Sequence, residues 1–163
     1  MSNNLIQRVA FHEAGHAVAC ILMNRSFDSV FATIEGGCCS WESEQLRSWA
    51  RTNFFPRKPV EVEIVITYSG VTAERKFTGS YDTLGDDHDM DRIITLASKV
   101  CGDMTSVEKL MNRLYKRSEK LWTKKTWPAV EAVAAKLMNG VELNYEEVKP
   151  IVMLQLPGVK KPF

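Results

Sequence analysis

The chain has 163 residues, 45% of them hydrophobic, and its 21 basic and 20 acidic side chains leave a formal net charge of +1. A chain of this size can bury a core without disulfides, and we expect a single domain over residues 1–155 and a loose tail over 156–163. The balanced charge gives no reason to expect a nucleic-acid or membrane-surface partner. No stretch approaches the roughly 18 apolar residues that span a bilayer, and no signal peptide or CxxC pair is present, so the expected location is cytoplasmic.

The first third of the chain is predicted to contain one long helix and a short β element. Apolar residues at helical spacing predict a helix over 2–25. Short apolar clusters over 26–55, broken by adjacent glycines, predict a strand or two and a polar loop. Residues 60–68 alternate between apolar and polar side chains, which favours a strand, although Pro59 is also a good early residue of a helix.

The rest of the chain is predicted to be helical. An acidic run that begins at Asp86 favours a helix start, because carboxylates there interact with free backbone N–H groups. Asn144 and Glu147 form a capping-box pattern that predicts a final short helix before Pro150. The other helices expected from apolar spacing cover 86–102, 107–121 and 128–138.

The motif His-Glu-Ala-Gly-His occupies residues 12–16, inside the first predicted helix. Positions i and i+4 share a helix face, so His12 and His16 can bind one zinc ion while Glu13 reaches the water beside it. Zinc acidifies that water and polarises a scissile carbonyl, and Glu13 would move the proton to the leaving amine. Gly15 costs a helix about 1 kcal/mol relative to Ala, which indicates a close approach of another backbone. The motif predicts a zinc-dependent peptidase, against the alternative of two structural histidines.

Such a site requires a third protein ligand. The residues alone offer five candidates whose donor atoms zinc accepts, and they do not choose among them. These candidates are Glu74, Asp86, Asp87, His88 and Asp89.

Three blocks of the sequence resemble the peptidase domain of FtsH, the AAA+ zinc protease. They read His-Glu-Ala-Gly-His-Ala over 12–17, Ser-Gly-Val-Thr-Ala-Glu over 69–74, and Gly-Asp-Asp-His-Asp-Met over 85–90. The third block of the family reads Gly-Ala-Ser-Asn-Asp-Leu and its Asp is the third zinc ligand, which by position implies Asp89 here. His88 then replaces the family's Asn. The resemblance extends loosely over about 5–143.

The resemblance implies a mainly α-helical fold with a small β element, an FtsH-peptidase-like zincin domain. It implies that 60–68 is helical, and that a short strand near Ala32 to Ile34 lies beside the cleft and pairs with an extended substrate. Glu74 would orient a ligand or be a surface charge. His88 would donate to the developing oxyanion, bind the metal, or be a polar residue at a helix start.

The expected function is a metallo-endopeptidase that hydrolyses unfolded or flexible polypeptides without its own ATPase module, because the chain lacks GxxxxGK[ST]. Alternatively, the chain works with a separate ATPase or adaptor. A hexamer is expected if the chain keeps the subunit arrangement of FtsH.

Two other functions compete with the peptidase prediction. One is a catalytically inactive module that keeps the fold and serves in binding or regulation, against which the retained Glu13 argues. The other is a nucleic-acid-binding protein that uses the basic face over 109–125 with Trp122 and Trp127. We expect that face to be solvated and those aromatic residues to pack in the core.

Overall fold

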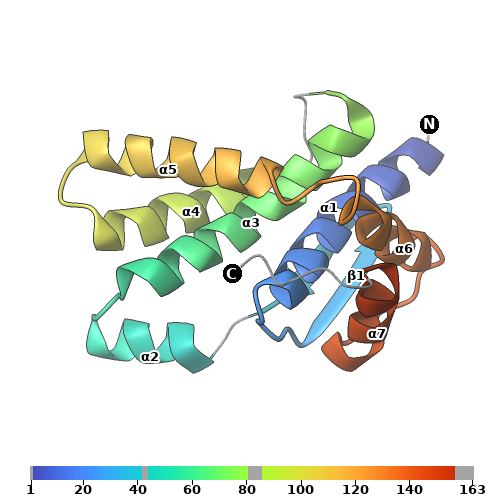
Figure 1. Cartoon of the computed structure of the whole chain (residues 1–163), viewed down its shortest axis with the longest axis horizontal. Helices are drawn as coiled ribbons and strands as arrows, with labels where there is room; N and C mark the ends of the chain where they lie inside the picture. Colours follow the sequence, from blue (N-terminus) through green and yellow to red (C-terminus); the bar gives the residue numbers. More distant parts are fainter. Residues whose placement is uncertain (1, 42–43, 81–85, 157–163) are drawn as a thin grey trace.

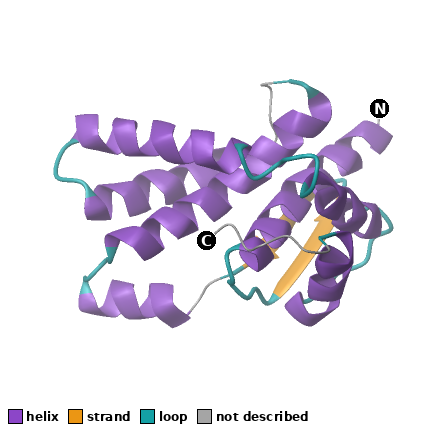
Figure 2. Cartoon of the chain, in the orientation of Figure 1, coloured by secondary structure: helices purple, strands orange, loops and turns teal. Residues whose placement is uncertain are grey.

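The computed structural model describes residues 2–41, 44–80 and 86–156, and it is mainly helical (Figure 1), as predicted. A two-stranded hairpin is the only β-sheet of the described residues (Figure 2). None of the helices in these ranges is long and apolar enough to cross a bilayer. In chain order, the elements are α1 (Ser2–Leu22), β1 (Ser29–Thr33), β2 (Gly36–Ser40), α2 (Glu44–Thr52), α3 (Arg57–Thr78), α4 (Asp86–Val100), α5 (Met104–Glu119), α6 (Trp127–Leu137) and α7 (Tyr145–Gln155).

Helices α1 and α3 pack against each other at the centre of the molecule and divide it into two sides (Figure 1). Helices α4 and α5 pack on α3, whereas the hairpin and α6 pack on α1, and α7 covers α6. Most of the core therefore packs against these two central helices. A side chain at the interface between α1 and α3 lies between the two sides of the molecule.

The backbones of α1 and α3 approach closely at Gly15. A Cβ atom added at Gly15 would lie 2.4 Å from the carbonyl oxygen of Ser69 and 2.7 Å from the Cβ of Ala73. The Ser69 hydroxyl donates a hydrogen bond of 3.1 Å to the carbonyl oxygen of Gly15. The close approach predicted from the cost of Gly15 is confirmed.

The strand predicted by alternation over 60–68 is wrong, because this segment forms the middle of α3. The intervening polar residues are buried as well, and Glu63, Thr67 and Ser69 are each completely inaccessible to solvent. A helix that is covered on all sides does not need an amphipathic repeat, so periodicity gave no helical signal here. The helical segment implied by the resemblance is correct.

The polar loop expected before residue 55 contains a helix that the sequence analysis missed, α2. Trp49 of this helix is buried, and Leu46, one turn earlier on the same face, is partly buried against the core. A helix of two turns gives too short a pattern for periodicity to detect, and its packing onto the core stabilises it.

Helix α7 begins as predicted but ends later. The Asn144 side chain accepts a hydrogen bond from the backbone N–H of Glu147, and the Glu147 side chain accepts one from the backbone N–H of Asn144, which confirms the capping box. The helix continues through Pro150 to Gln155, because buried residues such as Val152 lie beyond the proline and hold that turn against the core. Leu156, assigned to the loose tail, is also buried. The remainder of that tail, 157–163, lies outside the described residues.

The other helix predictions are confirmed. Helices α4, α5 and α6 correspond to the segments expected over 86–102, 107–121 and 128–138. Trp122 is buried and its Nε1 donates to the Thr72 hydroxyl at 2.9 Å, while Trp127 is partly buried against the core. The aromatic residues that the nucleic-acid alternative needs at the surface therefore pack inside, as expected.

The contact at Gly15 generates the first prediction. Gly15→Ala should lower the free energy of unfolding by about 1–3 kcal/mol, because the added methyl group forces α1 and α3 apart. Gly102→Ala is the matched control, since a Cβ atom there meets nothing within 4 Å, and it should change the stability by less than about 0.5 kcal/mol. Urea unfolding followed by circular dichroism measures both, and equal stability of the two variants would contradict the packing argument.

Candidate metal centre and cleft

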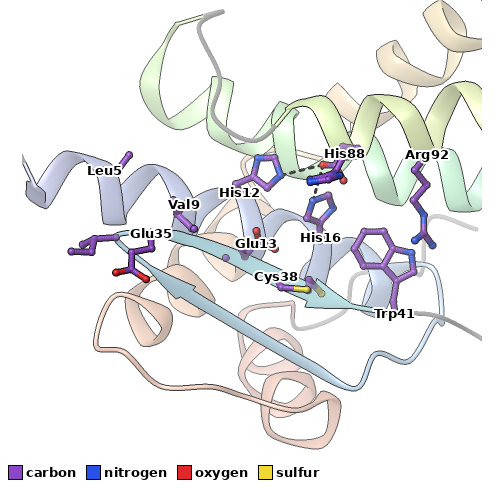
Figure 3. Close-up of a pocket in the computed structure, with 15 residues that line it drawn as sticks. Leu5, Val9, His12, Glu13, His16, Glu35, Cys38, Trp41, His88 and Arg92 are labelled. Carbon is purple, nitrogen blue, oxygen red and sulfur yellow. Dashed lines mark hydrogen bonds and ion pairs between the residues drawn. The ribbon is translucent and has the colours of Figure 1, made fainter.

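Three ligand atoms converge between α1 and α4. The Nε2 atoms of His12 and His16 lie 3.2 Å and 3.1 Å from the same carboxylate oxygen of Asp89, Oδ2. Both imidazoles are buried, and the carboxylate is 18% exposed. Figure 3 shows the two rings pointing from α1 towards α4, at the middle of a cavity. The structure thus brings together the three residues predicted as metal ligands.

The hydrogen bonds on the far side of each ring fix which nitrogen is free. His16 Nδ1 lies 2.9 Å from the backbone carbonyl oxygen of Ile66, and this carbonyl can only accept, so Nδ1 carries the proton. His12 Nδ1 lies 3.2 Å from Glu74 Oε2, an oxygen of a carboxylate that pairs with Arg8. In their neutral forms, both rings therefore direct an Nε2 lone pair at a carboxylate oxygen. Three lone pairs at this separation repel one another unless a proton or a metal cation lies between them.

Two of the three separations between these atoms fit a small tetrahedral metal ion. Zinc binds imidazole nitrogen and carboxylate oxygen at about 2.0–2.2 Å, which places neighbouring ligand atoms of a tetrahedron about 3.3 Å apart. The two distances from Asp89 Oδ2 are close to that value, and the ligand atoms of the cluster all lie within 4.8 Å of one another. Among the described residues this cluster has three members, which leaves one tetrahedral position for water or a substrate.

Helix α3 orients both imidazoles from one face. Ile66 and Glu74, which hold the two Nδ1 atoms, lie one turn before and one turn after Gly70. A Cβ atom at Gly70 would lie 2.3 Å from His16 Nε2 and 2.7 Å from His12 Nε2. A side chain at this position would therefore occupy the space in which the rings converge.

Glu74 lies behind His12, where the resemblance implied a residue that orients a ligand, and it is not a surface charge. Its side chain is completely buried, one oxygen faces His12, and the other accepts a 2.9 Å bond from Arg8 Nε. Arg8 lies one turn before His12 on α1. The same helix therefore supplies both the predicted ligand, His12, and the cation that balances the charge of Glu74. The contact fixes the tautomer of His12 with Nε2 directed towards Asp89.

Glu13 is buried beneath β2. A Cβ atom at Gly37 would lie 2.6 Å from Glu13 Cγ, so only a glycine allows the strand to pass at this distance. Burial raises the pKa of Glu13, and this effect exceeds the lowering by the charges of His16 and His12 and by a hydrogen bond from the backbone N–H of Cys39. A carboxylate with a raised pKa, held next to the metal-ligand cluster, has the properties of a general base.

The cluster lies on a cavity of about 800 Å³. Leu5, Val9 and Glu35 lie at one end of it, and Trp41 and Arg92 lie at the other (Figure 3). The strand along the cavity is β2, and Ile34 of the turn before it also lines the cavity, whereas Ala32 is buried and absent from the lining. We expected a strand near Ala32 to Ile34 to border the cleft. This expectation is corrected, because the strand that borders it is β2, which lies a few residues later in the chain.

The remaining candidates for the third ligand have different positions. His88 is exposed and lines the cavity without joining the ligand cluster. Glu74 contacts His12 from behind instead of facing the other ligand atoms. The side chains of Asp86 and Asp87 lie outside the described residues.

The sequence analysis missed three residues of the site, Arg8, Trp41 and Arg92. The Trp41 ring lies 4.9 Å from the His16 ring, and the Arg92 guanidinium lies 4.7 Å above Trp41, as measured between group centres. The position of Arg8, four residues before His12, was a usable helical signal. Nothing in the sequence pattern linked Trp41 to the motif.

The side chains of the centre hold a proton strongly at His12. Burial lowers the pKa of His12, but hydrogen bonds with Asp89 and Glu74 raise it more, to about 10. Burial also raises the pKa of Asp89, yet the neighbouring His16 and His12 hold it well below its usual range. The centre therefore favours a bound positive charge.

A proton on His12 must leave when a metal ion binds, which generates the second prediction. Zinc binding at pH 7 should release about one proton, and the apparent zinc affinity should rise by up to about tenfold per pH unit between pH 7 and 8.5. Calorimetric titrations in buffers of different ionisation enthalpy count the protons. Binding enthalpies that do not depend on the buffer would contradict this prediction.

The same pKa predicts how stability depends on pH. The folded pKa of His12 lies above its ordinary value of 6.5, so its proton stabilises the metal-free protein fully below pH 6.5, and this contribution is lost as the pH rises through about 10. Zinc-loaded protein has no proton to lose there. Urea unfolding at several pH values between 6 and 10 should therefore show the loss from His12 only in the metal-free protein.

The pairing of Glu74 with His12 generates the third prediction. Glu74→Gln should weaken zinc binding by about 10–100-fold, because the amide orients the imidazole less strongly than a carboxylate does. The matched control is Glu63→Gln: Glu63 is also fully buried and accepts a bond from an arginine, Arg25, but does not contact either imidazole. Competition with a chromophoric chelator measures the affinities. Equal affinities of the two variants would remove Glu74 from the centre.

The centre thus combines three convergent ligand atoms, a buried carboxylate and an open cavity. No protein-family model matches the chain, and no curated protein matches it. The function is therefore argued from the geometry of this site and from the chemistry of its side chains.

Proposed function

We propose that this chain is a zinc-dependent metallo-endopeptidase with an FtsH-peptidase-like zincin fold. The single observation that carries the proposal is the convergence of the Nε2 atoms of His12 and His16 on Asp89 Oδ2, with Glu13 beside them. Two imidazoles and one carboxylate are a ligand set that zinc prefers. A purely structural zinc site fills its fourth position with protein, whereas here three ligands adjoin a cavity of about 800 Å³.

The residues of the centre divide the hydrolysis of a peptide bond among them. His12, His16 and Asp89 would hold zinc, which when bound supplies a Lewis acid that acidifies water and polarises a carbonyl oxygen. The Glu13 carboxylate accepts the proton of the attacking water and then donates it to the nitrogen of the leaving amine. Burial beneath β2 keeps the pKa of Glu13 raised before the cation binds, and the positive charge of the cation opposes that shift.

An extended polypeptide is the substrate class that fits the cleft. The N–H and C=O groups of Val30 both bond to Leu143, so Val30 faces away from β2. Val30 pairs with Cys39 and Ala32 pairs with Gly37, and in such an antiparallel pair the peptide groups of Cys39 and Gly37 point to the outer edge of β2. The Cys39 N–H is used by Glu13, which leaves the peptide groups of Gly37 and the Cys39 carbonyl for a substrate strand.

Binding along a strand edge requires a substrate segment without secondary structure of its own. We therefore propose that the chain cleaves unfolded or flexible polypeptides in the cytoplasm, either alone or with a separate ATPase or adaptor that supplies unfolded segments. The described residues contain no P-loop that could use ATP to unfold a substrate.

Glu13→Gln is the decisive variant and the fourth prediction. The amide keeps the shape of the side chain but cannot accept the proton, so the cleavage of unfolded casein should fall by at least about 10²-fold while zinc content stays at the wild-type level. The exposed Glu142 provides the control, and Glu142→Gln should keep wild-type activity.

Two results would contradict the proposal. Wild-type protein that contains zinc but cleaves no unfolded polypeptide would support the alternative, an inactive binding or regulatory module of this fold. The second result is that wild-type protein takes up no zinc and that Asp89→Ala has the same metal content. This result would show that the chain has no metal centre. Metal analysis of the purified variants distinguishes the two.

A further inference from the structure

We propose that the cleft selects its peptide by charge, with Arg92 binding a carboxylate of the substrate at one end and an apolar side chain occupying the other end. This inference rests on the proposed function, because it names the class of peptide that the site accepts. It assigns to Arg92 a role in specificity, separate from the chemistry at Glu13.

The guanidinium of Arg92 is held in place but lacks a hydrogen-bonded carboxylate. It lies over the Trp41 ring at 4.7 Å, and its Nε and Nη2 atoms are buried without an acceptor among the described residues. The nearest carboxylate oxygen, Glu63 Oε2, is 4.0 Å away from Nη2, beyond hydrogen-bond distance. About a third of the Arg92 side chain remains exposed, and the residue lines the cavity.

Among the described residues, the charges around Arg92 leave an excess of one positive charge. The other oxygen of Glu63 accepts a 2.9 Å bond from Arg25, so one buried carboxylate lies between two guanidinium groups. Asp89, one turn before Arg92 on α4, is engaged by the two imidazoles. A carboxylate that entered the cavity would therefore meet the exposed part of a charged, planar group that donates hydrogen bonds to carboxylates.

The distance along the cleft fixes which part of a peptide meets Arg92. The strand β2 passes Glu13 at Gly37, and Trp41 follows four residues later, which corresponds to about 13 Å of extended chain. The Trp41 ring leans back towards the centre and lies 4.9 Å from His16. A peptide laid along β2 therefore brings a residue within about four positions of the scissile bond to Arg92.

The opposite end of the cleft disfavours an acidic group. Leu5 lies there with 36% of its surface exposed, and Val9 lies between Leu5 and the histidines (Figure 3). Ile34, which precedes Glu35 in the chain, also lines the cavity and is 58% exposed. Glu35 lies at the same end (Figure 3), where its negative charge repels a carboxylate. The two ends of the cleft thus differ in charge and in polarity, so that they fix the direction in which a peptide binds.

The experiment measures peptide binding and peptide cleavage separately. Peptides with blocked termini carry a single Glu or Gln at each of four positions on either side of the scissile bond, and a second series has a free or amidated C-terminus. Binding is measured by fluorescence anisotropy with the zinc-loaded Glu13→Gln variant, and cleavage is measured with wild-type protein. We expect the carboxylate form to be preferred by about 10-fold on one side of the scissile bond only, as a charge-assisted hydrogen bond supplies.

Substitutions of Arg92 test whether its guanidinium is the group that binds the carboxylate. Arg92→Gln should abolish the preference, Arg92→Glu should reverse it, and Arg92→Lys should retain part of it, because the charge remains and the planar fork is lost. The matched control is Arg113→Gln, which removes the same charge from an exposed residue of α5 that pairs with Glu61, and it should keep the full preference. Circular dichroism and urea unfolding verify that each variant is folded.

The outcomes separate this inference from the proposed function. A preference of internal Glu over Gln identifies a side-chain carboxylate, whereas a preference for the free C-terminus identifies the chain end, and either one supports the inference if Arg92→Gln removes it. An Arg92-dependent preference in binding without any cleavage supports the inference while it contradicts the peptidase. Equal binding of all matched pairs, or a preference that survives Arg92→Gln in a folded protein, overturns the inference.

Discussion

The geometry of the candidate metal centre depends on the close packing of α1 and α3, which leaves no room for a side chain at Gly15, beside the α3 backbone, or at Gly70, beside the imidazoles of α1. At this distance one face of α3 reaches both imidazoles from behind, through the Ile66 carbonyl oxygen and the Glu74 carboxylate. Both Nδ1 atoms are thereby engaged, and both Nε2 atoms face the cleft. If the two helices were separated by the width of a methyl group, these hydrogen bonds would lengthen and the rings could rotate. The orientation of the ligands is thus a property of helix packing.

The negative charges of the candidate centre could be compensated by a divalent cation. Arg8 neutralises Glu74, which leaves two negative carboxylates next to the imidazoles, the buried one of Glu13 and the partly exposed one of Asp89. Such charges are costly to bury without partners. Burial lowers the pKa of His12 but its hydrogen bonds with Asp89 and Glu74 raise it more, and burial raises the pKa of Glu13, so both groups hold a proton more strongly than usual. A dication between His12, His16 and Asp89 would compensate the same two charges without displacing any side chain.

The sequence predicted most of the site because most of its chemistry lies in one helical turn. The i, i+4 spacing of His12 and His16 determines that both rings share a face, and the cost of Gly15 indicated the neighbouring backbone. Asp89 is different, since it lies 77 residues from His12. Chemistry alone left five candidates for the third ligand, and only the resemblance favoured this one. Contacts between distant segments depend on how the helices pack, which no local pattern records.

The errors in the predicted fold also arise from packing that no local pattern records. Alternation over 60–68 indicated a strand because α3 is buried on every side, and a helix in that environment needs no polar face. Trp41 and Arg92 were missed because their position depends on where β2 ends and on how α4 lies against it. The predicted strand beside the cleft was misplaced for a related reason. The hydrogen bonds between Val30 and Leu143 use the far edge of β1, which leaves β2 as the strand that borders the cavity.

In the proposed peptidase, the strand β2 couples the general base, Glu13, to the binding of a substrate. Its outward-facing Cys39 N–H donates to the Glu13 carboxylate, and Gly37 passes so close to Glu13 that the side chain has little freedom. The same edge offers its remaining peptide groups to an extended chain. A peptide that pairs with this edge therefore lies next to the base and excludes bulk water from it, which strengthens every electrostatic interaction in the centre. A displacement of β2 would then impair substrate binding and proton transfer together, although the strand supplies no side chain to either.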